Sequence, residues 1–189
     1  MRKYPFGFSP GFSLLEMLVT MTLIAALASL VVPCWGMLTK SRSKQAATSI
    51  VMESLERARH AAITKKTDVW VIFQHQGGLQ KDALRLLSRQ GGIITTLDSW
   101  QPLPTGISFF AGSDSLMKER PPAEILITAL NGETIVNGKL FGALMFQRSG
   151  RVGIPMQGGV PLILELNSVS SMSPTSILIS RATGRATTK

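Results

Sequence analysis

The residues that most clearly indicate a chemical function lie near the N-terminus, where Gly11 and Phe12 precede Glu16. Between Phe12 and Leu38, Glu16 is the only charged residue. An apolar stretch of this length spans a bilayer, since about 20 apolar residues at ~1.5 Å each cover the ~30 Å hydrocarbon core. A carboxylate in lipid costs roughly 2.5–3.5 kcal/mol at mid-bilayer and less near the interface. Glu16 is therefore expected to have a partner for its charge.

The segment GFSLLE, residues 11–16, closely resembles the class III signal of type IV prepilins and of the pseudopilins of type II secretion. The resemblance implies that a dedicated inner-membrane prepilin peptidase removes residues 1–11 and that the new N-terminal Phe12 is methylated. Glu16 would be the fifth mature residue, where this family needs a glutamate for filament assembly. Pro33 would occupy the position where many type IV pilins carry a proline, and it predicts a break in the helix.

The resemblance also suggests which cation could pair with the Glu16 carboxylate. In a filament, the free amine of Phe12 in a neighbouring subunit would supply a cation beside the Glu16 carboxylate. Such pairing relieves a charge that would otherwise be buried without compensation. We therefore predict contacts with other pilins or pseudopilins through the N-terminal helix.

Two other interpretations of the N-terminus remain open. Ala26-Leu27-Ala28 is the A-x-A pattern of an ordinary secretory signal cut before Ser29, which would release a secreted domain. The chain would otherwise stay as an uncleaved membrane anchor. Glu16 inside the apolar region argues against an ordinary signal.

The basic residues that flank the apolar run give no clear orientation. Arg2 and Lys3 precede it, but Lys40, Arg42 and Lys44 follow it directly, which blunts the positive-inside rule. The resemblance implies a cytoplasmic leader, because the prepilin peptidase acts on that side. The expected location is the bacterial inner membrane, with a single pass and a periplasmic C-terminal domain.

No group of residues in the rest of the chain predicts catalysis or a cofactor. His60 and His75 are the only histidines and have no second ligand at metal spacing. Ser9, Ser13 and Ser149 have no histidine and acid recognisably arranged for a triad. The chain is expected to be a substrate of the peptidase rather than an enzyme, and to bind no metal.

A second candidate site is basic. The formal net charge is +9, and the C-terminal half holds a group of basic residues that could contact DNA or another anion: Arg148, Arg151, Arg181, Arg185 and Lys189. Some pilins of natural-transformation systems bind DNA, and phosphate contacts of this kind are insensitive to sequence and sensitive to salt. The alternative is a set of solvated turns, which the absence of aromatic residues among the last basic residues favours.

The elements that would position these residues begin with one long helix, from about residue 13 to about residue 63. Its second half shows an apolar face at spacings of three and four, formed by Ala47, Val51, Leu55, Ala58 and Ala62. We expect a leader (1–11), a membrane and assembly helix (12–38), an amphipathic continuation (39–66) and a periplasmic β-rich domain (67–189).

After the helix, the pattern changes to short β-branched and apolar runs separated by glycine and proline. Strand candidates are residues 69–73, 83–88, 93–97, 107–111, 125–129, 140–146, 162–166 and 177–180. Gly91-Gly92 predicts a hairpin between the second and third of them, although residues 81–89 could instead form a short helix. The prediction is an α+β fold, a long N-terminal helix packed on an antiparallel sheet.

The C-terminal half extends the resemblance to the H-type minor pseudopilins and related minor pilins. In that group a strand ending in phenylalanine precedes a Gly-Arg turn, as at residues 145–151, and the last strand ends in a second Gly-Arg turn, as at residues 177–185. The only cysteine, Cys34, lies in the apolar run, so an intramolecular disulfide is impossible. The chain thus lacks the C-terminal disulfide loop of many major pilins, and a minor pseudopilin is the expected role.

Overall fold

The computed structural model describes residues 13–76, 81–110, 116–132, 139–154, 162–168 and 171–189, and the side chains within them except those of 30–41, 118, 154 and 171–173. The chain divides into two compact units, residues 1–41 and 42–189. Helix α1 (Leu14–Lys65) contributes to both, and every strand belongs to the second. The predicted α+β arrangement, an N-terminal helix followed by an antiparallel β-domain, is confirmed.

Helix α1 is continuous through Pro33, so the break predicted there is absent from this structure. A proline removes only one backbone hydrogen bond and crowds the preceding turn. The loss of one hydrogen bond is compatible with the continuous helical backbone that the structure describes here. The predicted apolar face of the second half is confirmed, because its five residues, Ala47 to Ala62, are each at most 1% exposed.

The strands form two antiparallel sheets rather than the one that the sequence predicted. The larger has the order β3-β2-β1-β6-β7, with β4 paired to β2. Its strands are β1 (Asp68–His75), β2 (Ala83–Gln90), β3 (Ile93–Thr96), β4 (Gln101–Pro102), β6 (Leu140–Phe146) and β7 (Val152–Ile154). The smaller has the order β10-β9-β8-β5, with β5 (Ile107–Phe110), β8 (Leu162–Ser168), β9 (Ser171–Ile179) and β10 (Ala186–Thr188).

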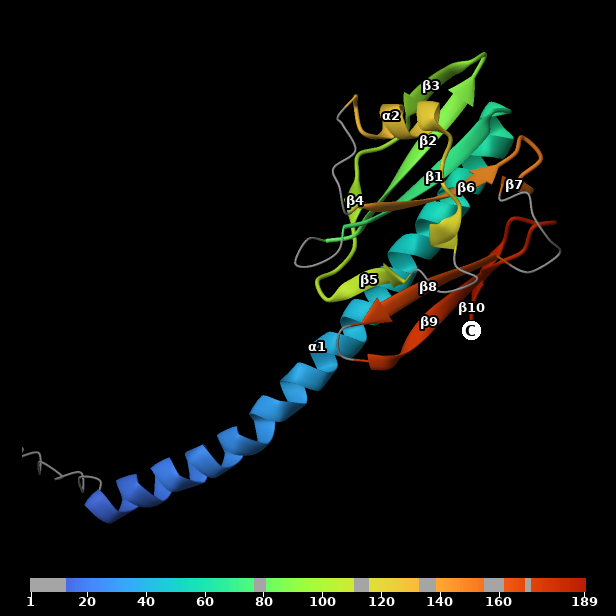
Figure 1. Cartoon of the computed structure of the whole chain (residues 1–189). Coiled ribbons are helices and arrows are strands. Elements are labelled where there is room, and N and C mark those ends of the chain that lie inside the picture. The colour runs from blue at the N-terminus through green and yellow to red at the C-terminus, as the bar shows by residue number, and fades with distance from the viewer. Residues whose placement is uncertain (1–12, 77–80, 111–115, 133–138, 155–161, 169–170) are drawn as a thin grey trace, which may run out of the picture. The chain divides into compact units, whose positions relative to one another are not determined.

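The main core lies between the second half of α1 and the two sheets (Figure 1). Alternate residues of β1 enter it, including Val71 and Phe73, as strand geometry requires. The Phe73 and Phe109 rings meet edge to face with centroids 5.4 Å apart, and this contact joins β1 of the larger sheet to β5 of the smaller one. Such aromatic pairs add about 0.5–1.5 kcal/mol beyond the area they bury.

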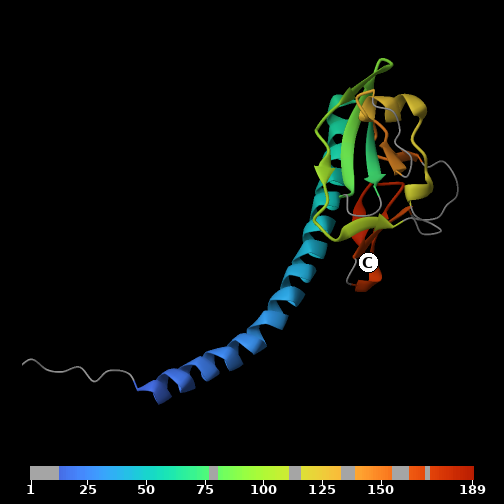
Figure 2. The ribbon, with the colours of Figure 1, turned by 60° about the vertical axis from the view of Figure 1, so that its left-hand side comes forward.

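The opposite face of the larger sheet carries a smaller core under α2 (Ala123–Ala129). Figure 2 shows β1 and β2 between α1 on one side and α2 on the other. The strand predicted for residues 125–129 is therefore wrong. Ile125 and Ala129, four residues apart, are buried on one helical face, and the N–H of Leu126 donates to the carbonyl of Pro122 to start the helix. An apolar run as short as this one does not distinguish a strand from a helix by its period.

The predicted hairpin of β2 and β3 is confirmed, with Gly91 and Gly92 both at positive φ. The alternative of a short helix at residues 81–89 is wrong, because residues 83–89 pair with β1. The strand predictions near residues 69–73, 107–111, 140–146, 162–166 and 177–180 are also confirmed. No sequence pattern predicted β4, β7 and β10, which have two or three residues each.

Asp98 follows β3 and provides a test of electrostatics in this domain. Its Oδ1 accepts a hydrogen bond of 2.9 Å from the N–H of Leu86. Burial raises the pKa of Asp98 above its ordinary value, although that hydrogen bond and the charges of Arg57 and Arg85 act in the opposite direction. Since the folded state disfavours the ionised carboxylate, the contribution of Asp98 to stability falls as pH rises from its unfolded pKa through its folded pKa.

We therefore expect Asp98→Asn, which keeps the oxygen acceptor, to raise the free energy of unfolding at pH 7. The gain should shrink as pH falls through the folded pKa and should be lost below the unfolded pKa, where the wild-type carboxyl is protonated in both states. Denaturant unfolding of both proteins at several pH values measures this difference. A variant equally stabilised at all pH values, or less stable than wild type at pH 7, contradicts the prediction.

Candidate functional site

The first turn of α1 holds Glu16 in a capping box with Ser13. The N–H of Glu16 donates to Oγ of Ser13 at 3.2 Å, and the N–H of Ser13 donates to Oε2 of Glu16 at 3.2 Å. The Ser13 hydroxyl lies 3.4 Å from the same carboxylate oxygen. A serine followed three residues later by glutamate gives this reciprocal arrangement, and the carboxylate also lies where the helix dipole favours negative charge. Glu16 thus has a local role that the sequence analysis did not consider.

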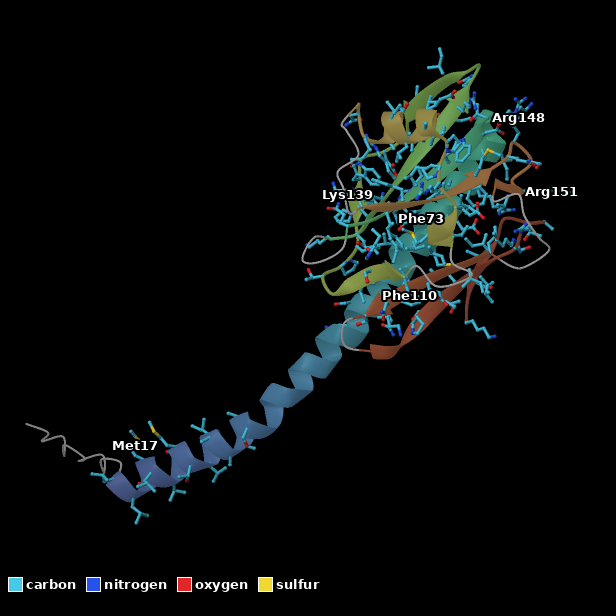
Figure 3. The ribbon with its side chains drawn as sticks, in the orientation of Figure 1. Met17, Phe73, Phe110, Lys139, Arg148 and Arg151 are labelled. Carbon is cyan, nitrogen blue, oxygen red and sulfur yellow. The ribbon has the colours of Figure 1, made fainter. Side chains whose placement is uncertain are left out.

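The first part of α1 carries apolar side chains on its surface, and they are exposed in the isolated chain. Leu14 is 85% exposed, Met21 67% and Ile24 65%, and the labelled Met17 projects from the helix in Figure 3. A hydrophobic surface of this extent normally marks contact with protein or lipid. The segment is therefore suited to bury this surface in lipid or against another protein. Glu16 is the one acidic residue in the described part of the segment.

In the part of the chain that the structure describes, no helix is both long enough and apolar enough to cross a membrane. The predicted cleavage site at Gly11 and Phe12 lies outside the described residues, as do the side chains of residues 30–41. The site residue Pro33 is therefore described only by its helical backbone.

The second candidate site is formed where the two Gly-Arg turns meet. The N–H of Val152, after the first turn, donates to the carbonyl of Arg181 at 3.0 Å. A Cβ atom at Gly184 would overlap the carbonyl oxygen of Gly150 and would lie 3.2 Å from Cδ of Arg59. The backbones of turns far apart in sequence thus approach as closely as glycine permits.

This approach brings together four of the five predicted basic residues. Arg148, Arg151 and Arg185 are exposed, and Arg181 is half-buried; Figure 3 labels Arg148 and Arg151 at this end of the larger sheet. Lys189 follows the opposite end of β10, and its N–H donates to the carbonyl of Ser176 at 2.9 Å. It therefore does not join the two turns.

Arg59 of α1 is a basic neighbour of both turns that the sequence analysis missed. Its side chain lies beside Gly150 and Gly184, and its Nη1 is 3.4 Å from Oε2 of Glu56. No local sequence pattern predicts this contact, because a helix residue and two turns distant in sequence meet only in the folded domain.

The close packing of the turns predicts a large effect of a side chain at Gly184, which has a φ of +65°. Gly184→Ala should lower the free energy of unfolding by about 2–4 kcal/mol, from left-handed strain of roughly 1–2 kcal/mol and from displacement of the Gly150 carbonyl. Gly106→Ala is the matched control, because Gly106 has a φ of +83° and open space around its Cβ position. Denaturant unfolding that gives equal losses in the two variants contradicts the close approach.

The histidines make no metal centre within the described residues, where no group of three or more His, Cys, Asp and Glu side chains lies together. His60 is exposed on α1. His75, at the end of β1, has its Nδ1 2.8 Å from Oδ2 of Asp82. Asp82 is 2% exposed, and sequence reasoning missed it because a lone aspartate before a strand resembles an ordinary turn residue.

Comparison with known proteins agrees with the N-terminal geometry. Residues 9–32 match the family model of the prokaryotic N-terminal methylation motif. No curated protein and no solved structure matches the chain. The motif points to a membrane-anchored, structural filament subunit of a kind that prepilin peptidase processes and that assembles with other pilins. The matched motif and the helix-and-sheet fold together support a type IV pilin-like, prepilin-type protein.

Proposed function

We propose that the chain is a non-enzymatic minor pseudopilin, similar to the H-type, of a type II secretion pseudopilus or a related type IV pilus-like filament. The methylation motif at residues 9–32 carries this proposal. It is supported by the exposed apolar surface that follows the motif in α1 and by the two strand-turn units that end in Gly150-Arg151 and Gly184-Arg185.

In the proposed sequence of events, prepilin peptidase cuts after Gly11 and Phe12 is methylated. Residues 12–38 then anchor the subunit in the inner membrane, with 39–66 continuing the helix and 67–189 as the periplasmic domain. An inner-membrane platform moves the subunit into a bundle of helices from other pilins. Apolar surface leaves lipid for protein in this step, so packing, small residues and polar pairing decide the energetics rather than transfer out of water.

The mass of the N-terminal peptide tests the proposal. The full chain is isolated from membranes of cells that contain prepilin peptidase and from matched cells that lack it. We expect a methylated Phe12 start only in the first sample. A Ser29 start in both samples indicates an ordinary secretory signal, and an intact Met1 in both indicates an uncleaved anchor; either result overturns the filament proposal.

A second candidate function, that of a DNA-binding minor pilin for DNA uptake, is favoured by one observation. The two Gly-Arg turns meet, and three of their arginines are exposed. Arg181→Ala/Arg185→Ala is expected to reduce DNA retention at low salt several-fold, since each phosphate contact adds to the salt-dependent part of affinity. Retention equal to that of wild type would remove this candidate and leave the pseudopilin proposal untouched.

A further inference from the structure

A cavity of about 390 Å³ opens on the α2 side of the larger sheet, where β1 ends and β2 begins. Its apolar lining comes from Ala83, Trp100, Pro102 and Leu130. A volume in this range accommodates a small ligand or a few residues of a peptide. The cavity lies apart from the assembly motif, and neither the pseudopilin nor the DNA proposal uses it.

The polar lining of this cavity is cationic and rich in amides. It consists of Lys81, Lys139, Gln74, Gln76 and Asn131, and the described lining contains no carboxylate. Figure 3 shows Lys139 near β4, away from the labelled Arg148 and Arg151 at the other side of the domain. The ammonium groups favour an anionic ligand, and the amides supply both donors and acceptors for peptide groups.

The buried Arg85 side chain holds two parts of the lining in place. The Arg85 guanidinium is 5.7 Å from the centroid of the Trp100 ring, and its Nη1 donates to the carbonyl of Ala129 and, at 3.3 Å, to Oδ1 of Asn131. Arg85 is only 7% exposed, so these contacts fix Trp100 and the segment after α2. Preorganised walls of this kind reduce the entropy lost on binding.

The other side of the cavity is held by Asp82. Its Oδ1 accepts a hydrogen bond of 2.9 Å from the N–H of Gln76, and Lys81 immediately precedes it. Gln74, a lining residue of β1, is 4% exposed. The cavity is thus bordered by strand ends whose positions are set by the sheet.

We propose that this cavity binds an acidic, carboxylate-bearing segment of a partner protein. Carboxylates would pair with Lys81 and Lys139, while the apolar lining takes the aliphatic part of the segment and the amides take its peptide groups. A sugar acid fits less well, because its hydroxyls need acceptors that the lining supplies only through amides, and because Arg85 occupies a face of the Trp100 ring that a sugar would stack on.

Fluorescence anisotropy with the full chain in detergent micelles tests the proposal. The probe is fluorescein-labelled hexaglutamate at about 0.15 M salt, where weak surface electrostatics are screened, with hexaglutamine as the uncharged peptide. Lys81→Gln/Lys139→Gln should weaken hexaglutamate binding about fivefold to tenfold, as expected for two partly exposed ion pairs. Lys65→Gln/Lys66→Gln removes the same charge from two exposed lysines that precede β1, at the end of that strand away from the cavity, and should change the Kd less than about twofold.

Equal weakening in the two double variants overturns the proposal, since binding would then follow net charge alone. Equal binding of hexaglutamine, or displacement by trigalacturonate at lower concentration than by unlabelled hexaglutamate, also overturns it. Carbodiimide cross-linking of hexaglutamate to the wild-type chain keeps the test valid if a variant fails to fold. Products at Lys81 or Lys139 support the cavity, and products spread over other lysines contradict it.

Discussion

Glu16→Gln is expected to prevent incorporation of the processed chain into filaments, with a reduction of roughly 100-fold or more. In the proposed filament, loss of the charge removes the partner of a neighbouring Phe12 amine, and breaking such a buried pair costs about 3–5 kcal/mol. The uncharged side chain also removes part of the cost of remaining in lipid. Both effects favour the membrane-anchored subunit over the assembled one.

Sheared filament fractions and membrane fractions, quantified with an antibody against the domain, measure this effect. The mass of the N-terminal peptide shows whether leader cleavage still occurs, which separates a defect in assembly from a defect in processing. Incorporation of Glu16→Gln at the wild-type level would reject the pairing.

Ser13→Ala is the matched control for the capping role of Glu16. It removes the hydroxyl that caps the first turn of α1 but leaves the carboxylate charge. Loss of an N-cap costs about 1 kcal/mol, so incorporation should fall by several-fold at most. If the two variants were equally defective, capping of the helix rather than pairing with an amine would explain the need for Glu16.

Asp82→Ala is expected to destabilise the β-domain by about 3–5 kcal/mol. The Asp82 carboxylate accepts hydrogen bonds from the N–H of Phe109 at 2.6 Å and from the N–H of Gln76 at 2.9 Å, and it lies 2.8 Å from Nδ1 of His75. Its removal leaves the two backbone donors without this acceptor, and each unsatisfied buried group costs about 1–3 kcal/mol. Because Phe109 belongs to the smaller sheet, the contact between the sheets is weakened as well.

Thermal unfolding of the full chain in detergent, followed by circular dichroism, measures the loss. A domain of this size should lose about 2–4 °C in Tm per kcal/mol, and therefore roughly 10 °C. His75→Gln is the control, because His75 is partly exposed and the Asp82 carboxylate keeps both backbone donors. A shift below about 2 °C for Asp82→Ala would show that the carboxylate does not join the sheets.

Local patterns were sufficient for several elements. The spacing from Ala47 to Ala62 predicted the buried face of α1, and Gly91-Gly92 predicted the β2–β3 hairpin, because helix faces and tight turns depend on neighbouring residues. The short run at residues 125–129 was assigned to the wrong element. Its burial as a helix depends on the sheet face beneath it, which is formed by residues distant in sequence.

The N-terminal signal, the single acid in the apolar run, the long helix and the α+β class could all be predicted from the sequence alone. Each depends on the order and period of nearby residues. Three features became visible only in the folded domain: the strands divide into two sheets, the Gly150 and Gly184 turns meet beside Arg59, and Asp82 joins β1, β2 and β5. Those contacts bring together segments far apart in the chain, and the packing of the whole domain selects them.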